Sequence, residues 1–371
     1  MNPAPEHVNT LVIGGGQAGL AVGYHLSRVG VPFLIVDANR RTGDSWRNRW
    51  DSLRLFTPNR FNSLPGLPIP GEDWSFPTKD ELGDYLETYA AHFDLPIRHE
   101  VKVERLGREG KRFVVAAGDQ VFEADNVIVA RASYQEPKTP PLASEIDPGI
   151  VQLHADDYRN PGQLQDGDVL VVGLGNSGAE IAKELIRDRR VWLSGEPSGV
   201  QPFRPEKLSG RMLMPLVGPV ILNRVLTTST PMGRRVHSKM RHRGAPLMRV
   251  KPKDLVAAGV QRVGRVVAAV DGRPQVEDGT VLDVRNIVWS TGYGPGYGWV
   301  DLPVFDEVGD VVHSRGIVDQ VPGLYFVAVK FLYSVLSDTL LGVGRDAAHV
   351  VDHLVAHRHS PSVTSAGRTS A

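Results

Sequence analysis

The chain of 371 residues contains no cysteine. The absence of thiols excludes disulfide bonds, thiolate metal sites, a cysteine nucleophile and a redox-active Cys-x-x-Cys pair. A chain without cysteine is indifferent to the redox state of its surroundings, so this absence does not define a compartment. No apolar run approaches the length of a membrane-spanning helix. The first residues lack a basic segment followed by an apolar one, so we expect no secretory signal and a cytoplasmic location.

The sequence also lacks an excess of positive or negative charge. Lys and Arg together number 42, as do Asp and Glu. This balance gives no electrostatic argument for nucleic acid or an anionic membrane as a partner. No group of His, Asp and Glu has the spacing of a metal site, and the adjacent acids Asp156 and Asp157 are interpreted as solvated loop residues. We therefore expect no metal and no nucleic-acid partner.

The sequence does contain the glycine fingerprint of a dinucleotide-binding turn, twice. The first copy is TLVIGGGQAGLAVGYHL and the second is VLVVGLGNSGAEIAKEL. Each follows an apolar strand-like run and opens an amphipathic helix-like run, which is the context that gives this weak motif its specificity. Two such sites predict two bound dinucleotides and hydride transfer between them. The glycines in the G-x-G-x-x-G positions are Gly14, Gly16 and Gly19 in the first copy, and Gly173, Gly175 and Gly178 in the second.

Each glycine of the first fingerprint has a physical role. Gly14 permits a tight turn, Gly16 lets the backbone approach a pyrophosphate, and Gly19 lets the helix pack on the strand. The helix N-terminus then presents unpaired N–H groups and a partial positive charge to the phosphates. Asp37 follows Gly19 by 18 residues, at the end of the second expected strand, where a carboxylate accepts hydrogen bonds from a ribose diol.

The second fingerprint repeats this geometry with different polar residues. Asn176 and Ser177 stand at the turn and can donate to phosphate oxygens. Glu196 follows Gly178 by 18 residues, and a carboxylate there favours a ribose 2′-hydroxyl over a 2′-phosphate. A nearby cation, Arg204 or Lys207, is the alternative partner for a 2′-phosphate. The choice between NADH and NADPH therefore stays open.

The pattern of strands and helices predicts an α/β fold with two Rossmann-like dinucleotide-binding domains, the second inserted into the first. Residues 10–37 and 168–193 each predict a β-α-β unit. The irregular segment 38–77 is long enough to suggest a functional loop. Residues 81–93 predict an amphipathic helix, and residues 342–357 a closing helix. We place the domains at 8–145 with 285–358, and at 160–284, followed by a disordered tail at 359–371.

The segment 211–244 is apolar, interrupted by proline and glycine, and then basic. We interpret it as a helical excursion whose charged face is solvated. The alternatives are a lip at a substrate entrance, a lip that grazes a membrane, and an interface for homo-oligomerisation.

An ordered series of motifs then points to a family. Along the chain these are GGGQAG, GDSW, LRLFTP, FPTKDEL, YQEPKTP, LHADDYRNP, GLGNSGAE, WSTGY, LYFVAVKF and GVGRD. In this order and spacing they resemble the class B flavin-dependent monooxygenases, in particular the short bacterial branch related to flavin-containing monooxygenases and plant indole-pyruvate monooxygenases. The resemblance extends from about residue 10 to about residue 357.

The resemblance implies FAD at the first turn and NADPH, or NADH, at the second. The implied enzyme is a monooxygenase: NAD(P)H reduces FAD, dioxygen adds to the flavin C4a carbon, and the resulting peroxide oxygenates a small organic substrate. The flavin supplies the chemistry, so no catalytic residue is assigned. The implied cofactor-binding residues are Gly14, Gly16, Gln17, Ala18, Gly19, Asp37, Gly43, Ser45, Trp46, Val103 and Ala130 for FAD, and Gly173, Gly175, Asn176, Ser177, Gly178, Ser194, Thr291 and Gly292 for the nicotinamide nucleotide and the junction of the domains.

Some positions depart from the family pattern. Arg131 and Ala132 stand where relatives have Thr-Gly, which either weakens cofactor binding or leaves it unaffected if Arg131 turns outward. The nearest match to a Thr-Asn pair beside the flavin is Thr57-Pro58, so no catalytic asparagine is implied. His154, in LHADDYRNP, is interpreted as a structural residue of the linker. Residues 55–61 and 330–341 are expected either to line a substrate pocket or to belong to the core.

Other functions share the two fingerprints. A disulfide reductase is set aside because it needs thiols. An FAD oxidoreductase that passes electrons elsewhere, without oxygen transfer, is the main alternative. A non-enzymatic nucleotide-binding module is the third.

Overall fold

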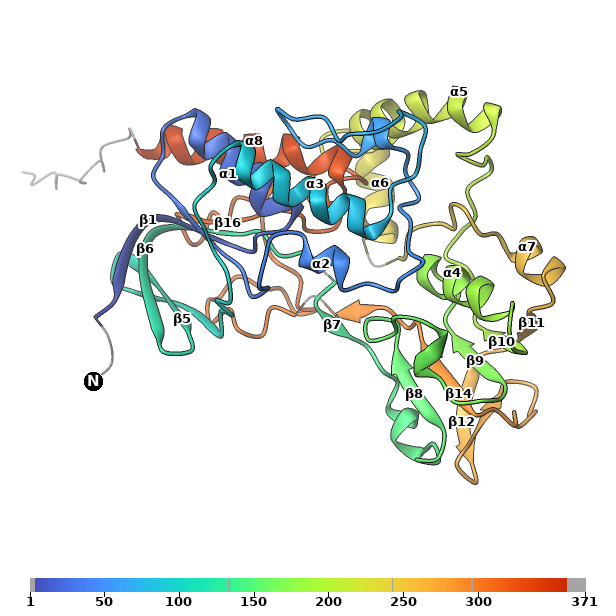
Figure 1. The fold of residues 1–371 in the computed structure, drawn as a ribbon. Coiled ribbons are helices and arrows are strands. Elements are labelled where there is room, and N and C mark those ends of the chain that lie inside the picture. Colours follow the sequence, from blue (N-terminus) through green and yellow to red (C-terminus); the bar gives the residue numbers. More distant parts are fainter. Residues whose placement is uncertain (1–3, 133, 242, 295, 359–371) are drawn as a thin grey trace, which may run out of the picture.

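The computed structural model describes residues 4–132, 134–241, 243–294 and 296–358. The predicted disordered tail at 359–371 lies outside the described residues. Within them the chain forms two α/β units, each built on its own sheet (Figure 1).

The first unit is built on a seven-stranded sheet. Its strand order is β3-β2-β1-β6-β5-β4, with β16 paired to β6. The pairings among β3, β2, β1, β6 and β16 are parallel, whereas β4, β5 and β6 form an antiparallel meander that turns at Gly110 and Gly118. The strands are β1 (Glu6–Ile13), β2 (Leu34–Val36), β3 (Ile97–Arg98), β4 (Arg105–Glu109), β5 (Arg112–Ala117), β6 (Gln120–Val129) and β16 (Leu324–Phe326).

Three helices cover one face of this sheet: α1 (Gln17–Arg28), α3 (Lys79–His92) and α8 (Leu340–Arg358) (Figure 1). Helix α3 begins with a capping box, in which Thr78 accepts from the backbone of Glu81 and the Glu81 carboxylate accepts from the backbone of Thr78. The segment 38–77 contains only the short helix α2 (Asp44–Arg47) and a 3-10 turn (Asn59–Phe61), in agreement with its irregular sequence.

The second unit has a parallel five-stranded sheet in the order β11-β10-β9-β14-β8. All four residues of β9 and of β14 are buried, as expected for central strands covered on both faces. The segment 266–276 forms a separate antiparallel hairpin. The elements are β8 (Val151–His154), β9 (Val169–Val172), α4 (Asn176–Leu185), β10 (Val191–Ser194), α7 (Pro252–Ala257), β11 (Gln261–Val263), β12 (Val266–Val270), β13 (Arg273–Val276) and β14 (Asn286–Trp289), with 3-10 turns at Pro141–Glu145 and Pro161–Gln163.

The chain crosses between the units twice, at neighbouring places. The outgoing crossing contains β7 (Glu136–Pro137) and the returning one contains β15 (Tyr293–Gly294), and the two pair antiparallel. The second sheet is thus inserted between β6 and β16 of the first. The predicted fold class, two Rossmann-like domains with one inserted into the other, is confirmed, while the exact domain limits stay predictions.

A helical excursion between β10 and β11 leaves the second unit and packs on the first. It consists of α5 (Leu208–Leu216), a π-helical segment η4 (Val217–Val225) and α6 (Pro231–Met240). Its bridge between Thr227 and Ser334 attaches it to the segment that precedes α8.

Candidate functional site

The first glycine turn joins β1 to α1 at the carboxyl edge of the first sheet. Gly14 has φ +110°, and its N–H donates to the carbonyl oxygen of Val36 at 2.8 Å. A Cβ on Gly19 would overlap the Gly14 carbonyl oxygen, so only glycine lets the helix approach this strand so closely.

The N-terminus of α1 is open. Its N-cap, Gly16, makes no side-chain capping bond, and a Cβ placed on it would meet only Ser45 Oγ, at 4.0 Å. The unpaired N–H groups therefore face room beside a hydroxyl, which fits a pyrophosphate. Ser45 belongs to α2, whose N-cap Gly43 has φ +91° and lies against Gly83 of α3. This contact brings the GDSW motif to the first turn.

The second glycine turn, between β9 and α4, has the same construction. Gly173 has φ +108°, and a Cβ on it would overlap the Ser290 carbonyl oxygen. A Cβ on Gly178 would overlap the Gly173 carbonyl oxygen, while a Cβ on Gly175 would meet nothing within 4 Å. Gly175 is the N-cap of α4 and has no side-chain capping bond. A second open helix N-terminus is therefore available to a dinucleotide.

The acidic residues predicted after the second strand of each unit differ in their position. Asp37 is buried, and its carboxylate accepts a hydrogen bond from the Gly15 N–H at 2.5 Å. It also accepts two from Asn39, one from the backbone N–H at 2.7 Å and one from the side-chain amide at 2.8 Å. Strand register pairs Ile13 with Val36 but Val172 with Ser194. The position equivalent to Asp37 is therefore Gly195, which comes one residue before Glu196, because the second connection is one residue shorter.

Glu196 is nonetheless close to that position. Its side chain is 73% exposed and accepts from Arg262 on β11 at 2.9 Å. Arg262 also donates to the Gly195 carbonyl oxygen at 2.8 Å. The Glu196 carboxylate, paired with Arg262, is thus next to Gly195 at the end of β10.

The polar side chains of the second turn are mostly bonded to the protein itself. Asn176 donates to the Pro246 carbonyl oxygen at 3.0 Å and accepts from the Met248 N–H at 3.1 Å. Ser194 is buried, donates to the Gly264 carbonyl oxygen at 2.8 Å and accepts from the Val266 N–H at 3.2 Å. Contacts from these two residues to a nucleotide would thus come mainly from their backbone. The other predicted residues are placed as follows: Ala18 is buried in α1, Ser177 lies in the first turn of α4, Trp46 packs against the core, and Val103 and Ala130 are core residues beside the first sheet.

At the start of α1, the predicted cofactor residue Gln17 belongs to a polar group whose contacts with Asp338 and Tyr134 the sequence did not indicate. Gln17 donates to the Asp338 carbonyl oxygen at 3.1 Å, and its own Oε1 is buried without a partner in the described residues. The Tyr134 hydroxyl donates to the Asp338 carboxylate at 3.0 Å. Burial raises the pKa of Asp338, and the Asp338 charge raises the pKa of Tyr134 well above its usual range. The orphaned amide oxygen beside the open helix end fits a bound group that carries a hydrogen-bond donor.

The two crossings between the units are fixed by a network around His154. The His154 Nδ1 accepts the Asp156 N–H at 3.1 Å, so its Nε2 donates to the Gly292 carbonyl oxygen at 3.2 Å. Burial lowers the pKa of His154, which keeps it neutral. Arg49, from the loop after α2, donates to Asp156 and, at 2.9 Å, to the Tyr293 hydroxyl. These contacts support a structural role for His154 and place Gly292 at the junction.

Thr291 and Arg131 lie near the junction between the two units; Arg131 is one of the positions that depart from the family pattern. Thr291 donates to the Lys138 carbonyl oxygen on the opposite crossing. The stem of Arg131 lies against the first turn, 3.4 Å from a Cβ placed on Gly14. Its guanidinium donates to Gln135 at 2.7 Å and lies over the Trp299 ring. The charged end of Arg131 is thus held by Gln135 and by Trp299.

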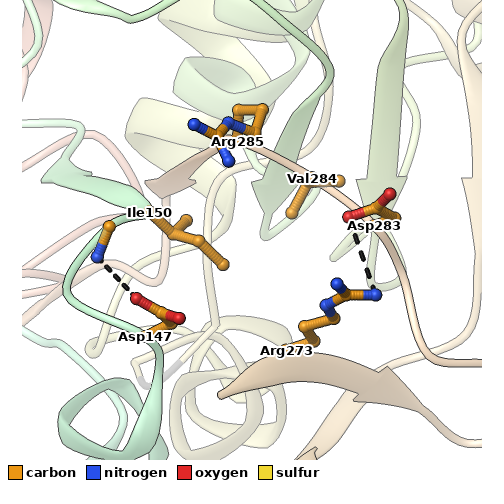
Figure 2. A pocket seen from close by; sticks show the side chains of 7 residues that line it. Asp147, Ile150, Arg273, Asp283, Val284 and Arg285 are labelled. Atoms are coloured by element: carbon orange, nitrogen blue, oxygen red, sulfur yellow. Dashed lines mark hydrogen bonds and ion pairs between the residues drawn. The ribbon is translucent and has the colours of Figure 1, made fainter. Parts of the chain in front are cut away.

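A small pocket elsewhere in the second unit does not belong to these sites. Figure 2 shows it between Asp147, Arg273 and Asp283, beside Ile150 and Arg285. Asp147 and Ile150 precede β8, and Asp283 and Arg285 precede β14, so the pocket lies at the amino edge of the sheet, opposite the glycine turn. Its volume of about 100 Å³ is below the range that ligand pockets usually have.

Two dinucleotide cradles on neighbouring units define an oxidoreductase of the two-nucleotide class. Comparison with known proteins places it further: a model of the pyridine nucleotide-disulphide oxidoreductase family matches residues 11–216, which is more than half of the chain. The chain belongs to this family. The absence of cysteine excludes the dithiol chemistry in the family's name.

Individual relatives are similar over almost the whole chain. An uncharacterized oxidoreductase CzcO-like of Geobacillus kaustophilus is 38% identical over 352 residues, covering 94% of this chain and 99% of the relative. The probable indole-3-pyruvate monooxygenase YUCCA7 of Arabidopsis thaliana is 29% identical over 320 residues, covering 76% of this chain and 73% of the relative. The structure of a flavin-containing monooxygenase from Stenotrophomonas maltophilia superposes with a TM-score of 0.76 at 28% identity, covering 95% of this chain and 99% of the other.

These similarities confirm several predictions. The protein resembles flavin monooxygenases, it is an oxidoreductase, and FAD with a nicotinamide dinucleotide is the cofactor pair of its family.

In the part of the chain that the structure describes, no helix is long and apolar enough to cross a membrane, and no group of three His, Asp or Glu side chains is arranged to hold a metal ion.

Proposed function

We propose that the protein is an FAD-dependent monooxygenase that is reduced by NADH or NADPH and transfers one oxygen atom of dioxygen to a small organic substrate. The observation that carries this proposal is the pair of open helix N-termini, at Gly16 and Gly175, on two units whose crossings pair side by side. The 28% identity with a flavin-containing monooxygenase over nearly the whole chain supports oxygen transfer over other two-nucleotide chemistry.

The protein's own part in this proposal is binding, orientation and exclusion of water. The backbone N–H groups at the starts of α1 and α4 bind the two pyrophosphates. When bound at the first turn, FAD would supply the chemistry of hydride acceptance and oxygen transfer. Gln17 and Asp338 lie where the first helix opens and are proposed to contact the flavin, together with the cofactor residues predicted from the sequence. A cytoplasmic location and homo-oligomerisation stay predictions.

The cheapest test is the absorption spectrum of the purified protein. We expect a flavin spectrum that bleaches with NAD(P)H in the absence of oxygen. In air, candidate amines, sulfides and α-keto acids are screened for product carrying oxygen from isotopically labelled dioxygen, with hydrogen peroxide measured in parallel. Rapid NAD(P)H oxidation with hydrogen peroxide as the sole oxygen product would identify an oxidoreductase without oxygen transfer. A colourless protein that takes up no FAD would identify a non-enzymatic module.

The choice of nicotinamide nucleotide gives a second prediction. The exposed Glu196 carboxylate stands beside the end of β10, where it repels a 2′-phosphate. We expect NADH to be preferred, and Glu196→Gln to narrow the NADH-to-NADPH ratio of kcat/KM by about 3- to 10-fold. Steady-state kinetics with both nucleotides measures this, and Glu307→Gln serves as an exposed-acid control distant in sequence. An unchanged ratio in Glu196→Gln would remove Glu196 from nucleotide selection.

A further inference from the structure

The excursion between β10 and β11 carries charge of one sign. Residues 207–243 contain no Asp or Glu, although the chain as a whole is neutral. The balance over the full sequence therefore conceals a local excess of positive charge. The basic residues of this segment are Lys207, Arg211, Arg224, Arg234, Arg235, Lys239, Arg241 and Arg243.

The same segment displays apolar side chains to solvent. Leu208, Met212 and Leu216 follow one another at four-residue intervals, so they lie along one face of α5, with exposed fractions of 73%, 73% and 52%. A row of large apolar side chains with such high solvent exposure is rare on a protein surface. Further along the segment, Val220, Ile221 and Val225 of η4 and Met232 of α6 are exposed as well.

The opposite side of the excursion is firmly attached. Met214, on the inner face of α5, packs with Phe61 and Phe203. The Asn223 carbonyl oxygen accepts from Arg345, and the Thr228 N–H donates to the Tyr333 carbonyl oxygen at 2.8 Å. The outer apolar side chains are therefore held outward by a packed inner face, and their exposure does not result from a loose segment.

The basic side chains are largely uncompensated. In the described ranges, Arg241 alone among the eight forms an ion pair, with Asp310 at 2.8 Å and Asp306 at 4.0 Å. The others are exposed, so their charge is available to an external partner. We name the surface formed by the exposed residues of 207–243 the basic apolar face.

We propose that the basic apolar face binds the surface of an anionic lipid bilayer, with α5 lying in the interface. A helix with exposed apolar residues flanked by Lys and Arg buries the former among lipid headgroups and pairs the latter with lipid phosphates and carboxylates. A second copy of the chain is disfavoured as the occupant, because a two-fold contact of this face with itself would oppose positive charges.

This face adjoins the first cofactor site. Thr227 bridges to Ser334, and Gly218 lies beside Leu341, in the segment that also carries Asp338. Bilayer binding would bring that segment to the membrane, where apolar substrates concentrate. The inference itself concerns binding and does not depend on the proposed oxygen transfer.

Co-sedimentation of the full chain with sucrose-loaded vesicles tests the proposal. We expect binding to phosphatidylcholine vesicles that contain about one third phosphatidylserine, little binding to pure phosphatidylcholine, and loss of binding as salt rises from about 0.1 to about 0.5 M. The double variants L208S/M212S and R235Q/K239Q should each reduce the bound fraction at least about threefold. All four side chains are exposed, so folding should be unaffected.

Matched control variants distinguish vesicle binding by the basic apolar face from nonspecific adsorption. V308S changes an apolar side chain that is 76% exposed, and R40Q/K111Q removes two exposed charges from the first unit. Both should bind vesicles as the unaltered protein does. Equal binding to neutral and anionic vesicles, no binding, or unaltered binding by both test variants would overturn the proposal. The proposal would also be overturned if light scattering showed that the unaltered protein is a dimer, that L208S/M212S is a monomer, and that neither binds vesicles.

Discussion

Gly16→Val is expected to give a folded but colourless protein. Gly16 has φ −80° and ψ −168°, an extended conformation that valine adopts without strain, and a Cβ there meets only Ser45 Oγ at 4.0 Å. The added side chain would instead fill the room in front of the unpaired N–H groups of α1. Loss of two charge-assisted hydrogen bonds, at about 1.5–3 kcal/mol each, weakens FAD binding by roughly 10²- to 10⁴-fold.

The measurement combines flavin content after purification with a denaturant unfolding curve of the FAD-free protein. We expect the free energy of unfolding of Gly16→Val to stay within about 1 kcal/mol of the unaltered apoprotein, since only an N-cap preference changes. Gly19→Ala is the informative contrast, because its Cβ would overlap the Gly14 carbonyl oxygen and should lower stability directly. Full flavin content in Gly16→Val would show that the first pyrophosphate site lies elsewhere.

Gly175→Val should give the complementary result: a yellow protein that nicotinamide nucleotides no longer reduce efficiently. Gly175 has φ −89°, and a Cβ there meets nothing within 4 Å, so the chain accepts valine. The valine would occupy the room in front of the N-terminus of α4. By the same hydrogen-bond argument, kcat/KM for NAD(P)H should fall at least about 10²-fold while FAD content is unchanged.

Anaerobic stopped-flow reduction measures this effect. Dithionite should still reduce the flavin of Gly175→Val at the normal rate, because that reaction does not use the second site. The two valine variants act as controls for each other, since one removes FAD and the other spares it. Reduction of Gly175→Val by NADH or NADPH at the unaltered rate would contradict the assignment of the second turn.

Local features of the structure were predictable from the sequence because they depend on neighbouring residues. The two β-α-β units follow from apolar runs on either side of a glycine turn, and the positive φ of Gly14 and Gly173 is what such a turn requires. The meander β4-β5-β6 contains short strands separated by turns at Gly110 and Gly118, and glycine is a local turn signal. Counting residues was less reliable: an equal interval of 18 suggested that Glu196 corresponds to Asp37, whereas strand register assigns that position to Gly195.

The sequence by itself determined the two nucleotide-binding turns, the exclusion of thiol chemistry and the family, since these depend on residue types at short, fixed spacings. Only the tertiary structure decided which side chains meet across long intervals. Gln17 and Asp338 are 321 residues apart, and the docking of α8 beside α1 brings them together. Tyr134 and Asp338 are 204 residues apart and also meet only in the folded chain. It also decided which side of 207–243 faces solvent, because a helix buries the face that finds a partner, and periodicity alone does not say where that partner is.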